Sequence, residues 1–581
     1  MRRRPRPAVF DRRFGRHLWR LIRVYWMSPQ GRRGALLLAG AIALELSTVY
    51  GTFLLSDAER RIIDALQDKR SAEFLSGLAL FAAVSLGFVL VGAYRVYLRQ
   101  LVEIRWRRSV TAHYVDRWMN KRAYCQLQLH GDEVDNPDQR IAEDARDFVA
   151  SALGLSLSLL AAVTTLATFG GLLWVLSTHS RLPVGSAELH IPGFLLWVAV
   201  LYAALSTWLT HVVGRQLVPL NFDRLHYEAD FRYALMRFRD NVEAVVLSSG
   251  DTLEREGALA HFRRVMQNWW QLIAAQRRLA VFTGLIAQAN SVVPFLVAAP
   301  GFFAGLITLG VIVQIRFAYG QVSGALNWFV YAYQEVARWR ANVERLAMFA
   351  EVMDATDEDL AQSRLRVVPG ETPVLRLADL TLRTADGGAL MDTANATVHA
   401  GESVALTGPS GAGKTVLLRA IAGIWPFGAG RIEVPPPART LFVPQRPYLP
   451  EGSLRAALSY PASEGTFSDE RITATLRLLG LDQLVERLGD TAPWDKQLSP
   501  HEQQRVAIVR VLLNEPEWLF LDKATSDVDE QTERHVYALL AAHLPRTTVI
   551  SVAERPAVAS YHARHWAMVP RDDGTASLQA A

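Results

Sequence analysis

Six stretches of predominantly apolar residues constrain this chain more than any other feature of its sequence. A helix needs roughly 20 such residues to cross the hydrocarbon core of a bilayer. Runs of this length predict membrane-spanning helices, which satisfy their own backbone polar groups in lipid. The predicted spans are residues 34–55, 74–98, 149–177, 189–214, 280–299 and 301–323. Little more than Pro300 separates the last two, so we expect a tight hairpin there.

The composition agrees with a chain that is partly embedded in a membrane. Half of its 581 residues are apolar, and its length suggests roughly three to four domain-sized units. A single cysteine, Cys125, excludes an intrachain disulfide framework. The net charge of +5 is concentrated before residue 33 and in residues 94–122. This distribution favours contact with anionic membrane lipid, and we expect no nucleic-acid partner.

Arginine-rich segments orient the predicted spans. The N-terminal segment, the stretch after the second span and residues 222–279 are rich in arginine, whereas the loop between the third and fourth spans has one. The positive-inside bias places arginine-rich connections in the cytoplasm. We therefore expect a multi-pass protein with both termini in the cytoplasm.

The N-terminal segment, residues 1–33, is basic, and charges interrupt its first apolar run. It lacks a small-residue cleavage site, so it does not have the pattern of a cleaved signal peptide. We expect an amphipathic helix at the cytoplasmic membrane surface, with a disordered basic leader as the alternative. The expected apolar contacts are Trp19, Leu21, Ile22, Tyr25 and Trp26.

Two long connections, residues 99–148 and 215–279, read as charged helices that extend the spans into the cytoplasm. Within the second, apolar residues at three-to-four spacing predict an amphipathic helix over residues 222–279. These residues are Phe231, Leu235, Phe238, Val242 and Val246. We expect residues 34–345 to form one transmembrane domain together with these extensions.

Ionisable and amide side chains interrupt the apolar spans. Glu45 lies in the first span and Arg316 in the last, while Gln288 and Asn290 add polar character to the fifth. A charge in hydrocarbon is costly, so each can mark a substrate cavity, a proton site or an ion pair. The alternative for Arg316 is that its side chain reaches the membrane edge. All four are candidate cavity residues.

A phosphate-binding loop defines the second half of the chain. The sequence GPSGAGKT follows a predicted strand and precedes a predicted helix, the setting that this motif requires. Backbone N–H groups of such a loop face phosphates, its lysine neutralises the terminal ones, and its threonine ligates Mg²⁺. The expected nucleotide-binding residues are Gly408, Pro409, Ser410, Gly411, Ala412, Gly413, Lys414 and Thr415.

Strands, glycine turns and helices alternate around this loop, which predicts an α/β domain over residues 373–571. We expect residues 346–372 to be a linker and residues 572–581 to be a C-terminal tail. Gln445 follows one predicted strand and Asp522 ends another. Together with Thr415, they are the expected Mg²⁺ ligands.

Six spans followed by a phosphate loop, the segment LSPHEQQR and the segment FLDKATSDVD resemble an exporter-type ABC half-transporter over essentially the whole chain. VDNPDQRIAED, residues 134–144, resembles the corresponding region of SbmA/BacA-like and peroxisomal ABC transporters, and the bacterial YddA-like form with a fused ATPase is the most similar. The resemblance implies a six-helix membrane bundle followed by an α/β P-loop ABC ATPase domain in a bacterial inner membrane. It also implies a homodimer in which ATP lies between the phosphate loop of one chain and Ser499 and Gln503 of the other.

Five positions depart from the family pattern, and one of them is His501, which stands at the second of the two glycines usual in this signature. Pro500 follows Ser499 where a glycine is usual, which removes one backbone N–H donor. Thr384 stands where an aromatic residue commonly stacks on adenine. Lys523 replaces the glutamate that polarises the attacking water, and Glu554 replaces the switch histidine. A lysine with an ordinary pKa is protonated at neutral pH and cannot accept a proton.

Three accounts of the exchanged pair remain open. The site can bind ATP and hydrolyse it slowly; Glu554 can orient water while Lys523 supplies the positive charge; or a heterodimer partner can complete one working site. Lys523, Glu554 and Gln445 are accordingly the candidate catalytic residues. A lost general base typically costs about 100- to 10,000-fold in rate.

We therefore predict an ATP-binding transporter for a peptide-like, cobalamin-like or other hydrophilic compound, with slow hydrolysis. The alternative is a proton-coupled SbmA-like uptake protein, with Glu45 in the proton path and a vestigial or regulatory ATPase domain.

Overall fold

The computed structural model describes residues 12–120, 124–125, 136–178, 182–184, 187–189, 192–370, 372–435, 440–553, 555–572 and 574–580. Two compact units divide the chain. The helical unit comprises Met1–Val115 and Pro137–Met348, and the sheet unit comprises Asp116–Asn136 and Phe349–Ala581.

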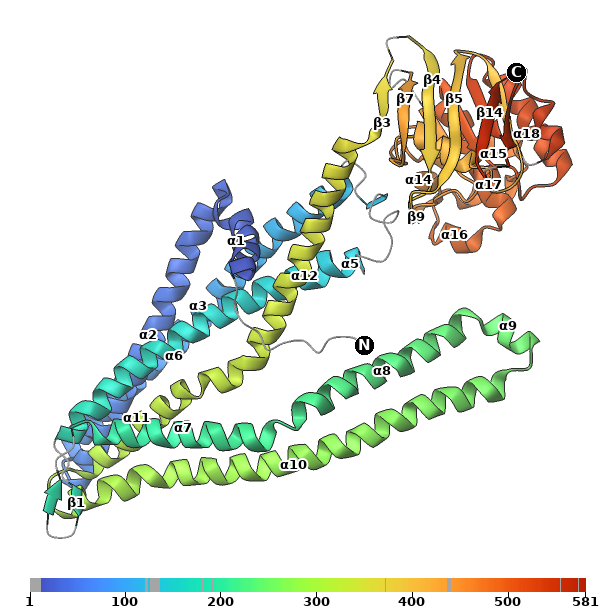
Figure 1. The fold of residues 1–581 in the computed structure, drawn as a ribbon. Helices are drawn as coiled ribbons and strands as arrows, with labels where there is room; N and C mark the ends of the chain where they lie inside the picture. Colours follow the sequence, from blue (N-terminus) through green and yellow to red (C-terminus); the bar gives the residue numbers. More distant parts are fainter. Residues whose placement is uncertain are drawn as a thin grey trace. The chain divides into compact units, whose positions relative to one another are not determined.

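Long helices and a few short helical turns build the helical unit, and the last residues of α3 and α12 continue into the sheet unit (Figure 1). They are α1 (Arg12–Trp26), α2 (Pro29–Gln67), α3 (Ser71–Met119), α5 (Pro137–Gln139), the π-helical turn η2 (Arg140–Asp144), α6 (Ala145–Thr178), α7 (Phe194–Gly214), α8 (Leu217–Asp240), α9 (Val242–Leu247), α10 (Asp251–Phe303), α11 (Leu309–Leu326) and α12 (Trp328–Gln362). A short hairpin, β1 (Leu182–Val184) with β2 (Ala187–Leu189), lies between α6 and α7. The fourth span was expected to begin at Leu189, which is the last residue of β2, and the helix α7 itself begins at Phe194.

Five helices of the described residues are long and apolar enough to cross a membrane: α2, α3, the helix from Pro137 to Ser177, α7 and α10. The sixth predicted span corresponds to α11, which is only 18 residues long and carries Gln314 and Arg316. Its apolar residues Ile315, Tyr319 and Val322 are buried in the core of the helical unit. Because α11 contacts α2, α6, α7 and α10, protein side chains surround much of it. Gln314 is buried among them, whereas Arg316 is exposed.

The predicted hairpin at Pro300 is wrong in its position. Pro294 and Pro300 both lie inside α10, which continues to Phe303. The chain reverses over the five residues that follow, where Gly305 has a φ of +73°. A proline removes one helical N–H donor but does not always end a membrane helix, because neighbouring groups satisfy the freed carbonyl.

The predicted single amphipathic helix over residues 222–279 is instead a helical hairpin. The helix α8 ends at Asp240, α9 ends at Leu247, and α10 begins at Asp251. Ser249 has a φ of +52° and lies in the reversal before Gly250. The two long arms α8 and α10 run side by side (Figure 1).

The apolar face of α1 packs largely on protein. Phe14, Leu21 and Tyr25 are buried, and the Tyr25 ring stacks against Trp106 of α3. Trp19, in contrast, is 59% exposed. The amphipathic helix expected in residues 1–33 is therefore present, but only part of its apolar face is open to lipid.

An ion-pair cluster joins the start of the third membrane helix to α12. Asp144 is buried and accepts hydrogen bonds from Arg345 at 2.6 and 2.8 Å and from Arg140 at 2.8 Å. The first two residues of VDNPDQRIAED lie outside the described residues. The last residue of that motif thus supplies a buried charge that two arginines compensate.

A ten-stranded mixed sheet forms the centre of the sheet unit, in the order β3-β7-β4-β5-β14-β13-β6-β12-β11-β8. Its strands are β3 (Arg364–Pro369), β4 (Val374–Arg383), β5 (Ala389–His399), β6 (Ser403–Thr407), β7 (Gly428–Val434), β8 (Thr440–Val443), β11 (Trp518–Asp522), β12 (Thr548–Val552), β13 (Arg564–Pro570) and β14 (Ala576–Ala580). The strands β13, β6, β12, β11 and β8 pair in parallel, whereas β4 pairs antiparallel with both neighbours. A separate pair is β9 (Gly452–Ser453) with β10 (Thr491–Ala492).

Helices cover this sheet, and its central strands are buried on both faces. The helices are α13 (Lys414–Ile421), α14 (Leu454–Ser459), α15 (Asp469–Leu478), the 3-10 helix η3 (Asp482–Arg487), α16 (Trp494–Gln497), α17 (Pro500–Asn514), α18 (Glu530–His543) and α19 (Pro556–Ala559). In β11, Trp518 and Phe520 join one apolar cluster, while Leu519 and Leu521 join the other. This continuous apolar run is typical of a parallel strand between two layers.

The sheet extends beyond the expected domain boundaries. The expected linker, residues 346–372, contains the end of α12 and strand β3, which pairs in parallel with β7. The expected tail, residues 572–581, contains β14, which pairs with β13 and β5. The partner of β3 is β7, and one partner of β14 is β5; both partners lie far away in the sequence. The local sequence pattern therefore did not predict these pairings.

The pairing of β14 yields a testable prediction. Ala576 is buried in the core, whereas Gln579 on the same strand is exposed. We expect Ala576→Asp to lower the free energy of unfolding of the sheet unit by about 3 kcal/mol, because it buries an unpaired carboxylate. Gln579→Asp should change it by less than about 0.5 kcal/mol. Thermal unfolding of the full-length protein measures both, and equal, negligible effects would show that residues 572–581 are a tail.

Candidate functional site

The phosphate loop connects β6 to α13 at the end of the parallel strands. Gly408, Gly411 and Gly413 have φ values of +138°, +84° and +94°, which side chains other than glycine rarely allow. A Cβ at Gly408 would also lie 2.6 Å from the carbonyl oxygen of Met568. Glycine is therefore required there by conformation and by space.

Lys414 begins α13 and is buried within the loop that precedes it. Its Nζ donates hydrogen bonds to the carbonyl oxygens of Gly408 at 2.7 Å and Pro409 at 2.8 Å. The ammonium group is thus held inside the curve of the loop, at the N-terminus of a helix. Both the charge and the helix dipole favour an anion at this place.

Thr415 and Asp522 meet across the sheet edge. The Thr415 hydroxyl donates a 3.0 Å hydrogen bond to Oδ1 of Asp522, the last residue of β11. Burial raises the pKa of Asp522, although the Thr415 bond and the charges of Lys523, Arg419 and Lys414 act in the opposite direction. A hydroxyl and a carboxylate side by side are oxygen ligands that suit Mg²⁺, so these residues fit a magnesium nucleotide.

Gln445, the third expected Mg²⁺ ligand, follows β8. Its Nε2 donates to the Ser526 hydroxyl at 3.3 Å, so its side-chain amide faces the loop after β11. Sequence reasoning did not assign a role to Gln504, which links the same two loops. Gln504 is 2% exposed and donates to the Gln445 carbonyl oxygen at 3.1 Å and to the Asp527 carboxylate at 3.1 Å.

Ser526 and the backbone of Asp527 complete the contacts of Gln504. Its Nε2 also lies 3.3 Å from the Ser526 hydroxyl, and its Oε1 accepts from the Asp527 N–H at 3.1 Å. One buried amide of α17 therefore joins the loop after β8 to the loop after β11. A glutamine in the EQQR segment was the available sequence signal, but its partners lie 22 or more positions away.

Ser499 caps α17. Its hydroxyl accepts from the Glu502 N–H at 3.3 Å, and the Glu502 carboxylate accepts from the N–H and hydroxyl of Ser499 at 2.9 and 2.8 Å. Burial alone would raise the pKa of Glu502, but these hydrogen bonds lower it below its ordinary value. Pro500 occupies the first helical position, where the missing N–H would lack a helical partner anyway.

Gln503, expected to contact nucleotide, is engaged locally. Its Nε2 donates to the carbonyl oxygens of Asp495 at 2.8 Å and Leu498 at 2.9 Å. Thr384, the expected adenine position, donates from its backbone N–H to the Gly388 carbonyl at 2.8 Å and lies in the turn between β4 and β5. Both residues therefore stabilise their own loops.

Lys523 follows Asp522 with a φ of +55°, a left-handed conformation that costs roughly 1–2 kcal/mol for a residue with a Cβ. Glu554, its expected counterpart, lies outside the described residues. The next residue, Arg555, donates to the carbonyl oxygens of Val528 at 2.9 Å and Ser526 at 3.1 Å. Arg555, which sequence reasoning missed, thus fixes the loop that begins at Lys523.

The cavity candidates of the helical unit have separate environments. Glu45 is 8% exposed, and its carboxylate lies 3.0 Å from Nη1 of Arg95 in α3. Of the three environments expected for it, the ion pair is the one present. Arg316 and Gln288 are exposed side chains.

Asn290 lines a polar cavity of about 290 Å³ between α7, α10 and α11. Its Oδ1 accepts from the Ser323 hydroxyl at 3.3 Å, and Thr207 donates to Asn327 at 3.1 Å in the same cavity. The complete lining is Tyr202, Ser206, Thr207, Thr210, Thr283, Ile286, Ala287, Asn290, Gly320, Ser323, Gly324 and Asn327. Of the four candidates, only Asn290 belongs to this set.

A unit of membrane-length helices and a sheet unit with a phosphate-binding loop together define a transport ATPase. Residues 21–303 match the family described as ABC transporter transmembrane region 2, and residues 391–526 match the family described as ABC transporter. The chain is 31% identical to the inner membrane ABC transporter ATP-binding protein YddA of Escherichia coli, over 93% of this chain and 94% of that protein. It belongs to the ABC transporter family, as an exporter-type half-transporter with a fused ATPase domain.

More distant relatives agree with this assignment. The chain is 28% identical to the chloroplastic ABC transporter D family member 2 of Arabidopsis thaliana, covering 96% of this chain and 86% of that protein. It is 27% identical to the human lysosomal cobalamin transporter ABCD4, covering 80% and 79%. A bacterial Atm1-family ABC exporter solved with ATP bound has the same fold, with a TM-score of 0.69 at 18% identity, covering 93% and 94%. The predicted fold class is thereby confirmed, and the chain is an ATP-hydrolysing translocase of the membrane.

The raised pKa of Asp522 yields a second prediction. A carboxylate with a raised pKa is destabilising when it is ionised in the folded protein, so at neutral pH its charge lowers the stability of the nucleotide-free state. Asp522→Asn should therefore leave the melting temperature unchanged or higher without nucleotide, and weaken Mg²⁺-dependent ATP binding at least tenfold. For the unmodified protein, ATP affinity should fall as the pH decreases through this raised pKa. Thermal unfolding with and without Mg²⁺ and ATP measures both effects, and a lower melting temperature of the nucleotide-free variant would contradict the assignment.

Proposed function

We propose that two copies of this chain form a transporter that moves a hydrophilic compound across a bacterial inner membrane and hydrolyses ATP slowly. The observation that carries this proposal is Lys523, directly after the half-buried Asp522 at the end of β11. Half-transporters of this family generally dimerise, and the arginine distribution of the sequence supports cytoplasmic termini.

The phosphate loop supports tight nucleotide binding. The enclosed Lys414 ammonium and the N-terminus of α13 would face the phosphates, and Thr415, Asp522 and Gln445 would hold Mg²⁺. Bound Mg²⁺ would neutralise phosphate charge during hydrolysis. Nothing in these residues distinguishes the site from one that binds ATP normally, so the expected defect concerns turnover.

Lys523 supports slow turnover. Its positive charge acts on the neighbouring Asp522, and a protonated amine stabilises a nearby γ-phosphate without taking a proton from water. The lost general base corresponds to about 100- to 10,000-fold in rate. The swapped pair and the heterodimer remain the competing accounts of the same substitution.

The cap at Ser499 adds to this effect. The Ser499 hydroxyl is already paired with Glu502, so contact with a nucleotide across a dimer would compete with the capping box. Loss of an N-cap typically costs about 1 kcal/mol. The closed dimer should therefore gain less from this serine than from one without a local partner.

The polar cavity at Asn290 supports a hydrophilic substrate. Its lining includes several hydroxyl and amide groups among membrane-length helices, where polar groups are costly unless they serve a ligand or one another. One relative carries cobalamin in its name, and peptide-like and cobalamin-like compounds both present many hydrogen-bonding groups. We assign the substrate to this broad hydrophilic class.

The alternative, proton-coupled uptake, depends on Glu45. Its carboxylate is paired with Arg95 at 3.0 Å, and a compensating charge explains why an acid is tolerated within α2. This ion pair favours a structural role for Glu45 over a proton-carrying one.

The ATPase rate of the full-length protein in lipid tests slow hydrolysis. We expect a turnover far below the roughly 10 s⁻¹ of a typical enzyme, and Lys523→Glu should raise it about 100-fold or more. Lys523→Gln is the matched control, because it removes the charge without supplying a base, and it should not reproduce this gain. A lower rate in Lys523→Glu would favour the swapped pair, and a normal rate in the unmodified homodimer would exclude slow hydrolysis.

Transport into membrane vesicles tests the cavity and its energy source. The probes are a labelled peptide and cobalamin. Asn290→Leu should reduce ATP-driven transport about fivefold, because the substrate would lose about one hydrogen bond. The neighbouring Gln288→Leu is the control, since Gln288 is exposed and outside the cavity lining. Transport driven by a proton gradient alone, and lost in Glu45→Gln, would instead establish the alternative.

A further inference from the structure

A second pocket lies where α1 turns into α2, beside α3, and is separate from the nucleotide and Asn290 sites. It has a volume of about 500 Å³. We call it the Tyr25 pocket. It is lined by Tyr25, Pro29, Gln30, Arg33, Arg105 and Arg108. All six residues belong to the helical unit.

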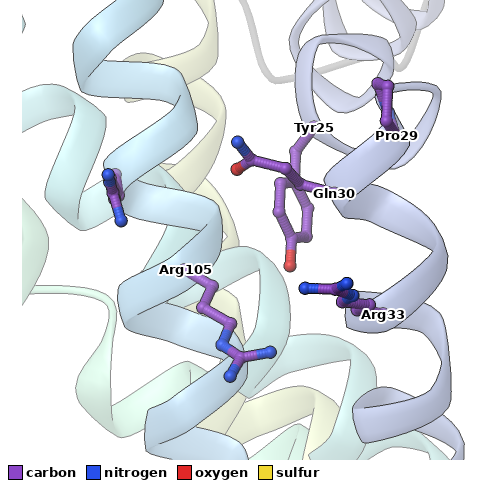
Figure 2. Close-up of a pocket in the computed structure, with 6 residues that line it drawn as sticks. Tyr25, Pro29, Gln30, Arg33 and Arg105 are labelled. Atoms are coloured by element: carbon purple, nitrogen blue, oxygen red, sulfur yellow. The ribbon is translucent and has the colours of Figure 1, made fainter.

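Tyr25 forms the floor of this pocket with an unpaired polar group. The side chain is 1% exposed, and its hydroxyl has no hydrogen-bond partner among the described residues. Figure 2 shows the hydroxyl directed toward the guanidinium groups of Arg33 and Arg105. A buried hydroxyl without a partner costs roughly 1–3 kcal/mol, so a ligand that accepts this hydrogen bond would be favoured.

The close approach of the helices fixes the hydroxyl in place. A Cβ at Gly34 would lie 2.2 Å from the Tyr25 hydroxyl, and a Cβ at Gly31 would lie 2.5 Å from the Tyr25 carbonyl oxygen. The ring also stacks against Trp106, with 6.4 Å between ring centroids. Tyr25 therefore has little freedom to turn its hydroxyl toward another partner.

The remaining groups around the hydroxyl are donors and positive charges. Within the described part of the chain, Arg33, Arg105 and Arg108 form no ion pair with a carboxylate. Pro29 and Gln30 are in the first turn of α2, whose N-terminus adds a partial positive charge. Burial raises the pKa of Tyr25, and the charge of Arg105 acts in the opposite direction. This combination is the chemistry of an anion site.

The pocket is located at the expected membrane surface. Arg33 directly precedes the predicted first span, and Arg105 follows the predicted end of the second by about 10 Å of helix. Both α2 and α3 are long and apolar enough to cross a membrane. Phosphate groups of lipids occupy this depth, and basic pockets between membrane helices bind lipid headgroups.

We propose that the Tyr25 pocket binds the phosphate of an anionic phospholipid headgroup. The arginines neutralise the phosphate charge, and the Tyr25 hydroxyl donates a hydrogen bond to a phosphate oxygen. The bound lipid holds α1 against α2 and α3, since all three helices contribute to the pocket. This role is independent of ATP hydrolysis and of the transported compound.

Native mass spectrometry of the detergent-solubilised full-length protein tests this assignment. The probes are phosphatidylglycerol, phosphatidylcholine and inorganic phosphate. We expect saturable binding of phosphatidylglycerol, weaker binding of phosphatidylcholine, and no retention of phosphate alone. Arg105→Gln/Arg108→Gln should weaken phosphatidylglycerol binding roughly 30-fold, and Tyr25→Phe about tenfold.

Two controls separate the pocket from general surface charge and from folding. Arg32→Gln/Arg107→Gln removes the same number of charges as the pocket variant, one from α2 and one from α3, at positions outside the lining, and it should leave lipid binding within about twofold. Tyr25→Phe should leave the melting temperature of the lipid-free protein unchanged or raise it, because the hydroxyl it removes has no partner in the described structure. Equal losses in the control and pocket variants would overturn the proposal. Retention of inorganic phosphate as strong as that of the lipid would assign the site to a soluble anion instead.

Discussion

The parallel order of β6, β12 and β11 is the constraint on which the nucleotide site depends, and the hydrogen bond between Thr415 and Asp522 is its direct result. It forms because β6 and β11 are parallel and, with β12 between them, end at the same edge of the sheet. That edge brings the start of α13, the end of β11 and the loop after β8 together. The residue that follows Asp522, Lys523, therefore lies at this edge of the sheet. Under the proposed function the phosphates would bind at the same edge, so a lysine there changes the expected chemistry directly.

The sequence alone predicted those features that depend only on residues close to one another in the chain. The GPSGAGKT motif identified the phosphate loop, whose glycines have positive φ, and long apolar runs identified most of the membrane helices, because neither signal depends on distant partners. Other features depend on contacts between distant parts of the chain. Pro300 does not end α10, β14 is a sheet strand, and Glu45 is paired with Arg95; each outcome depends on residues that lie far away in the sequence.

In the candidate site, too, the sequence predicted some contacts and missed others that depend on distant residues. The expected Mg²⁺ ligands Thr415 and Asp522 are in contact, whereas Gln445 is bonded to Ser526. Ser499 and Gln503 were assigned to nucleotide from the family pattern, yet in the single chain both stabilise the start of α17. The family pattern predicts a contact across a dimer for these two residues, whereas the described structure shows the contacts that they make within their own chain.

Gln504 gives this arrangement a mechanical consequence. Its buried side-chain amide forms hydrogen bonds to the loop after β8 and to the loop after β11, while its backbone belongs to α17. If either loop moved without α17, the buried Gln504 amide would lose a hydrogen-bond partner in the protein interior, which is costly. We therefore expect a nucleotide that displaces one of these loops to displace α17 and the other loop with it.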